Sequence, residues 1–258
     1  MNWRPMTARA EGWRVLLLAV AVILAAWAAG EIIEDWLPGH PLQAADQWTF
    51  ATLRGLRTPA VDQVMITLTE CGDALVVWGV ALAAGVWLAW RRAWRPLGYG
   101  LIAVGGGSLI NSAIKLAVHR ARPTDLHLAG ASLYSFPSGH STTNAVLYGF
   151  LIIVVWRQIG LQRLAPVMAV SAIFVAAICF SRLYLGAHWL SDVAGGLIFA
   201  TAWLILLTRL YSRRPAPDVA PLGLLMTAAI ALVVFSGISI ALDHAADLHR
   251  YAIVRGAE

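Results

Sequence analysis

Long apolar runs separated by short polar segments make up most of this 258-residue chain. Each run approaches the ~20 residues that an α-helix needs to cross the hydrocarbon core of a bilayer. The pattern predicts seven transmembrane helices, over residues 14–33, 74–90, 97–117, 141–157, 166–187, 189–208 and 219–242. We therefore expect an all-α fold, a polytopic transmembrane helical bundle in which residues 1–258 form a single integral membrane domain.

The first run has two possible interpretations. The small residues of AWAAG, at 26–30, resemble a cleavage site, which would make the run a signal peptide. The run is longer, however, than the ~7–15 apolar residues of a signal-peptide core. We expect a retained helix.

Composition agrees with a membrane protein, because 59% of the residues are hydrophobic and only 13% are charged. A soluble domain usually carries about 25% charged residues. The two cysteines predict no disulfide, since Cys179 falls inside an apolar run and Cys71 lies beside a loop.

The basic residues are distributed unevenly between the two sides of the predicted bundle. If the N-terminus is cytoplasmic, eleven of the 19 Lys and Arg residues fall on the cytoplasmic side and eight on the other. Three of those eight, Lys115, Arg122 and Arg182, are assigned to a candidate site below. An excess of basic residues inside is the usual topology, so we expect a multi-pass bacterial inner-membrane protein with a cytoplasmic N-terminus.

Segment 34–73 would lie on the outer side of the membrane. Its apolar residues are loosely spaced, as on an amphipathic helix at the membrane surface. We expect an outer interfacial segment here. The C-terminal tail from Asp243 is short, and we expect it to lie outside as well.

Three polar clusters interrupt the apolar pattern: KLAVHRARP at 115–123, PSGH at 137–140 and SRLYLGAHWLSD at 181–192. They close the third span, open the fourth, and connect the fifth to the sixth. An alternating path therefore places all three on the outer face. An ionisable group costs about 3 kcal/mol in the hydrocarbon core, so such clusters predict a functional site.

The charged residues of these clusters predict phosphate chemistry. Lys115, Arg122 and Arg182 are cations of the kind that stabilise the equatorial oxygens of a transferring phosphoryl group. Asp192 follows His188 by four residues, so on one helix face its carboxylate can fix the imidazole tautomer. The other ring nitrogen is then left as a nucleophile or base.

Backbone N–H groups at Ser138 and Gly139, just ahead of the fourth span, would add affinity for an anion. No group of Asp, Glu and His has the spacing of a metal site, so we expect neither a metal nor another cofactor, with the cations in the role of Mg²⁺. Lys115 is the single lysine beside 18 arginines: either the composition simply favours arginine, or this position favours a compact ammonium over a planar guanidinium.

Together the clusters resemble the signature of the type 2 phosphatidic acid phosphatase family, which shares its site with the vanadium haloperoxidases. The family pattern is K-x6-RP, then PSGH, then SR-x5-H-x3-D, and residues 115–192 fill every position. The resemblance implies a six-helix family core and no need for a metal, and the span 219–242 would be an extra seventh helix. The membrane spans exclude a soluble haloperoxidase.

The resemblance also implies a role for each motif residue. His188 would attack phosphorus and form a phosphohistidine, with Asp192 orienting its ring. His140 would protonate the leaving oxygen and later activate water. The other matched residues would bind the phosphate oxygens: Lys115, Arg122, Ser138, Gly139 and Arg182.

The remaining polar residues have simpler interpretations. Arg120 is expected to be a loop cation, and Glu70 and Asp73 to cap the outer end of the second span. The run 105–107 of glycines is expected to serve helix packing. Five histidines are expected to be solvated loop residues: His40, His119, His127, His244 and His249.

The predicted function is that of a metal-independent membrane lipid phosphatase that acts at the outer face. Its partners would be a lipid phosphate or diphosphate substrate and membrane lipids, with no nucleic acid. Candidate substrates are undecaprenyl diphosphate or monophosphate, phosphatidylglycerophosphate and phosphatidic acid, and an outward-facing site favours undecaprenyl diphosphate. Two alternatives are a phosphotransferase that passes the phosphate to another lipid such as lipid A, and a non-catalytic lipid-binding or transport protein. The intact His140, His188 and Asp192 argue against the last.

Overall fold

The computed structural model describes residues 41–256 except 125, 127, 129 and 216. Every regular element in this part of the chain is helical, which confirms the predicted fold class. The elements are α2 (Pro41–Gly55), α3 (Pro59–Glu70), α4 (Ala74–Trp90), α5 (Trp94–Leu101), the π-helical η1 (Ile102–Gly106), α6 (Gly107–Val118), the 3₁₀ turn η2 (Gly130–Leu133), α7 (Gly139–Ile159), α8 (Leu161–Tyr184), α9 (Leu190–Tyr211) and α10 (Pro221–Gly256).

Six helical stretches of the described residues are long and apolar enough to cross a membrane. They are Pro59–Trp90, Trp94–Val118, Gly139–Ile159, Leu161–Tyr184, Leu190–Tyr211 and Pro221–Ala252. They correspond to the last six of the seven predicted spans, and the predicted span 14–33 lies outside the described residues. The first of them begins at Pro59 because α3 and α4 are separated only by the turn at 71–73. The membrane-surface position of 34–73 stays a prediction.

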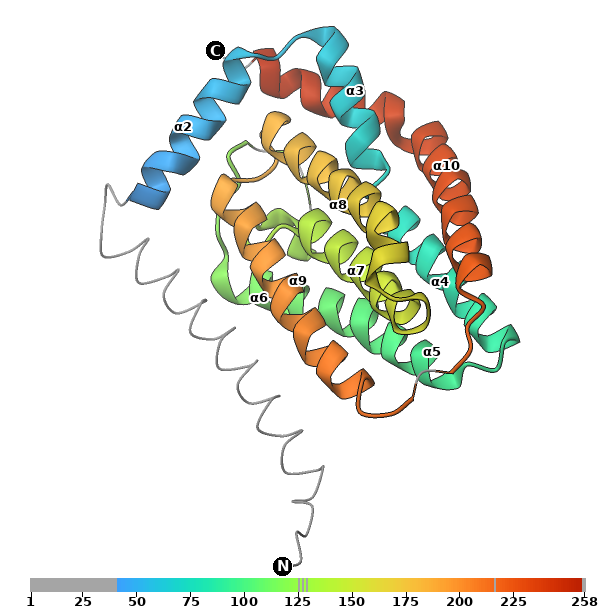
Figure 1. The fold of residues 1–258 in the computed structure, drawn as a ribbon. Coiled ribbons are helices and arrows are strands. Elements are labelled where there is room, and N and C mark those ends of the chain that lie inside the picture. The colour runs from blue at the N-terminus through green and yellow to red at the C-terminus, as the bar shows by residue number, and fades with distance from the viewer. Residues whose placement is uncertain (1–40, 125, 127, 129, 216, 257–258) are drawn as a thin grey trace, which may run out of the picture.

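Helix α7 lies in the middle of the bundle and contacts α4, α6, α8, α9 and α10 (Figure 1). Its inward residues, among them Phe150 and Val154, belong to one buried cluster that also includes Val80 and Trp203. Large apolar side chains such as Val170 and Val233 are exposed on the outside of the bundle. This arrangement suits a lipid surrounding, in which outward apolar residues carry no cost.

Two close helix contacts depend on glycine. A Cβ atom at Gly196 in α9 would lie 3.0 Å from the carbonyl oxygen of Ser138 and 2.9 Å from Oγ1 of Thr142. A Cβ at Gly106 would lie 3.1 Å from the ring of Trp203, whose Nε1 donates to the carbonyl oxygen of Ala103. The glycine run therefore packs η1 and the start of α6 against α9, as expected, and Gly196 lets α9 approach the first turn of α7.

The C-terminal prediction needs correction, because α10 does not end near residue 242. Apolar residues continue to recur on one face of the charged segment that follows, and no Pro or Gly interrupts it before Gly256. Its last turns pack with Leu248 and Tyr251 against Ile66. Arg57 donates to the carbonyl oxygen of Tyr251 at 2.9 Å and so holds this end of α10 in place.

Candidate active site

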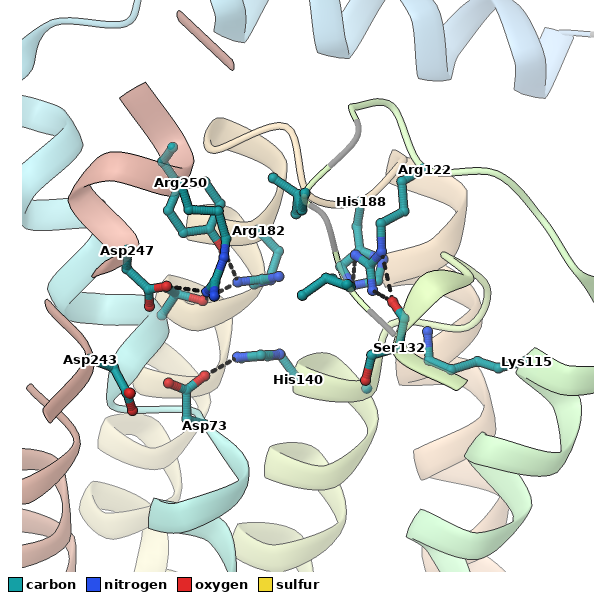
Figure 2. Close-up of a pocket in the computed structure, with 15 residues that line it drawn as sticks. Asp73, Lys115, Arg122, Ser132, His140, Arg182, His188, Asp243, Asp247 and Arg250 are labelled. Atoms are coloured by element: carbon teal, nitrogen blue, oxygen red, sulfur yellow. Dashed lines mark hydrogen bonds and ion pairs between the residues drawn. The ribbon is translucent and has the colours of Figure 1, made fainter. Parts of the chain in front are cut away.

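All three predicted polar clusters meet at one end of the bundle, around a cavity of about 350 Å³ (Figure 2). The cavity is formed by the C-terminal ends of α6 and α8, the N-terminal end of α7, the loops that precede α7 and α9, the turn after α3, and α10. Six of the eight predicted site residues line it: Lys115, Arg122, Gly139, His140, Arg182 and His188. The other two, Ser138 and Asp192, are fully buried behind them.

His188 lies in the turn between α8 and α9, and Asp192 lies in the first turn of α9. Nδ1 of His188 is 3.3 Å from Oδ2 of Asp192, and the backbone N–H of Trp189 donates to the same oxygen at 2.8 Å. A proton on Nδ1 therefore faces the carboxylate, which leaves the lone pair of Nε2 directed into the cavity. This is the i, i+4 contact that the sequence predicted.

Burial and the nearby charges of Arg122, Arg182 and Lys115 hold the pKa of His188 well below its ordinary value of 6.5. Burial disfavours the charged imidazolium, and three cations repel it further. At neutral pH the ring is therefore uncharged and its Nε2 can act as a nucleophile. Nη1 of Arg122 lies 3.2 Å from this nitrogen.

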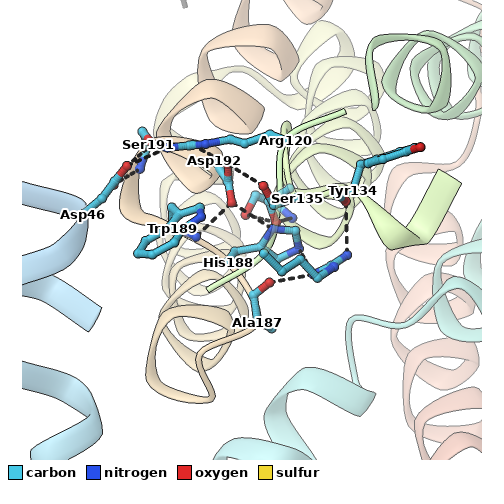
Figure 3. Close-up of polar contacts among 12 residues, drawn as sticks. Asp46, Arg120, Tyr134, Ser135, Ala187, His188, Trp189, Ser191 and Asp192 are labelled. Carbon is cyan, nitrogen blue, oxygen red and sulfur yellow. Dashed lines mark hydrogen bonds and ion pairs between the residues drawn. The ribbon is translucent and has the colours of Figure 1, made fainter. Parts of the chain in front are cut away.

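Asp192 is itself held by a network that reaches α2 (Figure 3). Nη1 of Arg120 contacts Oδ1 of Asp192 at 2.6 Å, and Nη2 of Arg120 contacts Asp46 at 2.9 Å. Asp46 also accepts from the hydroxyl and the backbone N–H of Ser191. Arg120 lies in the loop after α6, as expected, but its guanidinium is mostly buried between two carboxylates, which was not expected. No local pattern predicts these contacts, since Asp46 and Asp192 are both more than 70 residues from Arg120 in the chain.

The three cations are held by neutral oxygen atoms. Lys115 donates to the carbonyl oxygens of Tyr134 and Ser135. Arg122 donates to the carbonyl oxygens of Ala187 at 2.6 Å and Ser132 at 2.8 Å.

The Nη1 group of Arg182 donates to the hydroxyls of Thr69 at 2.6 Å and Tyr251 at 2.9 Å. Burial and the charge of Arg182 lower the pKa of Arg122 to about 10, so Arg122 is still cationic at neutral pH. Within the described residues no carboxylate forms an ion pair with any of the three. Their positive charge is available to an anion in the cavity, and a phosphate group matches it in charge and in number of oxygens.

Ser138 and Gly139 begin α7. The Ser138 hydroxyl accepts from the N–H of Ser141 at 3.4 Å, which makes it the N-cap, and its own N–H donates to the carbonyl oxygen of Asp192. Only Gly139 of this pair borders the cavity. The backbone at Gly139 and the positive end of the α7 dipole therefore lie at the cavity, where they would favour an anion.

Asp73, the residue before α4, contacts His140 at the cavity. Oδ1 of Asp73 lies 2.7 Å from Nε2 of His140, and the hydroxyl of Ser239 lies 3.4 Å from Oδ2. Asp73 does occupy the N-cap position of α4, but its side chain makes no capping bond. The expectation of a capping role for Asp73 was therefore wrong.

Helix α10 supplies further residues that the sequence analysis missed. Asp243, Asp247, Arg250 and Tyr251 all line the cavity, although the tail was expected to be a short outer segment. His244 lies in α10, with Nδ1 at 3.0 Å from the buried carboxylate of Glu70. It is therefore not a solvated loop residue, and Glu70 pairs with it.

The other histidines divide into two groups. His119 and His249 are exposed, as expected, although His249 belongs to α10 and not to a loop. His40 and His127 lie outside the described residues.

Comparison with known proteins agrees with the motifs. A profile of the PAP2 superfamily matches residues 95–216, a region that includes all three clusters. Phosphatidylglycerophosphatase B of Bacillus subtilis is 29% identical over 161 residues, which cover 61% of this chain and 78% of that protein. The undecaprenyl-diphosphatase BcrC of the same organism is 31% identical over 160 residues, covering 58% of this chain and 76% of the relative.

Two further comparisons extend this result. Lipid A 1-phosphatase of Rhizobium etli is 34% identical over 131 residues, covering 45% of this chain and 52% of that protein. The crystal structure of the transmembrane PAP2-type phosphatidylglycerolphosphate phosphatase from Bacillus subtilis superposes with a TM-score of 0.55 and 25% identity, covering 78% of this chain and 94% of that one. In motifs, fold and relatives alike, the chain belongs to the PAP2 superfamily, in its membrane-bound bacterial type.

Proposed function

We propose that this PAP2 protein hydrolyses a lipid phosphate or diphosphate through a phosphohistidine at His188, without a metal ion. One observation carries the proposal: three cations that form no ion pair with a carboxylate among the described residues surround the imidazole of His188. The second ring nitrogen of that imidazole faces the buried Asp192. Such a cavity offers a tetrahedral anion both charge neutralisation and a nucleophile.

In the first step the phosphate oxygens bind Lys115, Arg122 and Arg182, and one of them takes over the Arg122 N–H that now contacts His188. Nε2 of His188 then attacks phosphorus. A bond forms between nitrogen and phosphorus, and the bond from phosphorus to the leaving oxygen breaks. His140 donates a proton to that oxygen, which departs as a lipid alcohol or lipid phosphate.

In the second step water replaces the leaving group. His140, now neutral, removes a proton from the water as its oxygen bonds to phosphorus, and the nitrogen–phosphorus bond breaks. Inorganic phosphate leaves, and both histidines return to their starting protonation. The cations stabilise the charge on the equatorial oxygens in each transition state.

For the substrate we propose undecaprenyl diphosphate and phosphatidylglycerophosphate as the first two candidates. The two relatives whose names carry these lipids are each matched over about three quarters of their own length, whereas the lipid A 1-phosphatase is matched over about half. The positive-inside distribution supports a cavity that faces outward, toward the periplasmic leaflet.

The test is phosphate release by the full-length protein in detergent, with EDTA present, over a panel of lipid phosphates and diphosphates. We expect release from one lipid class without an acceptor. Turnover that needs an added acceptor such as lipid A, with the phosphate transferred and not released, would replace hydrolysis by phosphotransfer. Loss of activity in EDTA would contradict the metal-independent mechanism.

A further inference from the structure

Asp73 lies outside the three motifs and outside the matched region 95–216, yet it contacts a motif histidine. It comes from the turn between α3 and α4. Figure 2 shows it joined to His140 on one side of the cavity, with His188 and Arg122 on the other. The Nε2–Oδ1 distance of 2.7 Å is that of a strong, charge-assisted hydrogen bond.

A purely structural role does not account for the direction of this carboxylate. An Asp at the N-cap of a helix normally accepts a hydrogen bond from the first-turn backbone, and Asp73 does not. Instead Oδ1 faces the imidazole, and Oδ2 faces Ser239 of α10. Neither oxygen accepts a hydrogen bond from the first turn of α4.

We propose that Asp73 is the positioning residue of His140 and fixes its ring so that Nδ1 is the nitrogen that transfers protons. This rests on the proposed function and adds a second carboxylate–histidine pair to it. In the first pair Asp192 faces Nδ1 of His188 and leaves Nε2 to attack phosphorus. In the second pair Asp73 engages Nε2 of His140, and no hydrogen bond among the described residues engages Nδ1.

The negative charge of Asp73 is as important as its geometry. During the first step Nδ1–H of the imidazolium protonates the leaving oxygen, while Nε2–H continues to donate to Asp73. During the second step Nδ1 takes a proton from water, and the resulting imidazolium is stabilised by the carboxylate. The proton that leaves in one step returns in the next, and Asp73 itself remains ionised.

The experiment separates positioning from folding by varying the leaving group. An alkyl phosphate needs its leaving oxygen protonated, whereas the nitrophenolate of p-nitrophenyl phosphate leaves readily without a proton. In Asp73→Asn we expect turnover of phosphatidic acid to fall about 100-fold, the scale of general acid–base catalysis. Phosphoenzyme formation from p-nitrophenyl phosphate should fall by less than about tenfold.

Rapid quenching supplies a second readout. Because Asp73→Asn also weakens His140 as a base, the phosphohistidine formed from p-nitrophenyl phosphate should accumulate in the variant and not in the wild type. Asp218→Asn is the matched control, an exposed carboxylate of the loop between α9 and α10, and should behave as wild type. Asp73→Ser keeps a capping residue ahead of α4 and replaces the Asn variant if that variant does not fold.

The proposal would be overturned if phosphatidic acid turnover and phosphoenzyme formation from p-nitrophenyl phosphate fell by the same factor and no phosphoenzyme accumulated. Unchanged turnover of both substrates would overturn it as well. The proposed function fails separately, when the wild-type protein releases no phosphate from any lipid or when His188→Ala stays active. An active wild type with a dead His188→Ala and equal losses in the Asp73 variant would remove this inference alone.

Discussion

The three cations of the cavity differ from most buried cations in what holds them. Buried charges in proteins are usually paired with opposite charges. Here Lys115, Arg122 and Arg182 are anchored by carbonyl and hydroxyl oxygens, and none of them forms an ion pair with a carboxylate among the described residues. Under the proposed function, the phosphate of the substrate would supply the opposite charge.

The first prediction at the residue scale concerns the charge state of His188. Burial comes first and Arg122 second among the causes that lower its pKa. Replacing Arg122 by Gln should therefore raise that pKa toward its ordinary value. Histidine ring NMR in detergent, over a pH titration, measures it directly. Arg91→Gln, at the opposite end of the bundle, should leave the titration unchanged, and an unshifted His188 in Arg122→Gln would contradict the electrostatic account.

The same shift has a consequence for stability. The folded chain binds a proton at His188 less readily than the unfolded chain does, so acidification below pH 6.5 favours unfolding. The contribution of this group to the free energy of unfolding is present above pH 6.5 and is lost as the pH falls. In Arg122→Gln this loss of stability on acidification should be smaller, because the pKa values of His188 in the folded and the unfolded chain are closer together.

Contacts between residues could be predicted from the sequence where the two partners lie within a few residues of each other in the chain. The i, i+4 contact of His188 and Asp192 follows from helix geometry alone. Asp73, Arg120 and Tyr251 were missed because their partners are 67, 72 and 69 residues away in the chain. Only the packing of separate helices brings such pairs together.

At the scale of the elements, the approach of α9 to α7 sets the distance between the two histidine-bearing turns. Gly196→Ala would put a methyl group 3.0 Å from the carbonyl oxygen of Ser138. We expect overpacking to cost about 1–3 kcal/mol, and activity to fall because the first turns of the two helices separate. Thermal unfolding and phosphate release in detergent measure both.

Gly98→Ala is the control for this substitution, because nothing lies within 4 Å of the new Cβ. It should leave activity unchanged and should not destabilise the protein, since alanine favours the helix. A Gly196→Ala protein as stable and active as Gly98→Ala would show that the contact between α7 and α9 does not shape the site.

The second prediction at this scale concerns the C-terminal half of α10. Tyr251→Phe removes the hydroxyl that contacts Arg182 and keeps the ring in its apolar contacts. A hydrogen bond to a charged group contributes about 1.5–3 kcal/mol, so kcat/KM should fall roughly tenfold or more. Tyr148→Phe removes a buried hydroxyl that has no hydrogen-bond partner among the described residues, and should have no effect. Equal kcat/KM in the two variants would contradict the role of α10.

The continuation of α10 shows why element boundaries were harder to predict than elements. The apolar run ends near residue 242, and the span predicted from the sequence ended there as well. Helix formation continues because the following residues are helix-compatible and present Leu248 and Tyr251 to a buried cluster. The end of the helix is therefore decided by tertiary packing, which cannot be deduced from the hydrophobic pattern of one segment.

At the scale of the whole molecule, the cavity lies at one end of a bundle whose other end holds the loop between α9 and α10. The alternating path of the spans predicted that the three clusters would share one end, and they do. The alternation could be predicted because a single apolar segment can pair all of its backbone N–H and C=O groups inside a bilayer only as a spanning helix.

The orientation of the bundle is tested by labelling single cysteines in cells. In a chain with Cys71 and Cys179 replaced by serine, His249→Cys near the cavity should react with a membrane-impermeant maleimide in intact spheroplasts. Asp218→Cys in the loop between α9 and α10 should react only after permeabilisation. The reverse pattern would place the cavity in the cytoplasm and contradict the outward-facing site.

The measurement that tests the central claim most directly is the trapping of the phosphoenzyme. Wild-type protein is mixed with a ³²P-labelled lipid phosphate that it hydrolyses, quenched in alkali and digested, and the labelled peptide is identified. The account predicts an acid-labile phosphate on His188 in the wild type and neither label nor turnover in a folded His188→Ala protein. Label on a different residue, or turnover in His188→Ala, would contradict it.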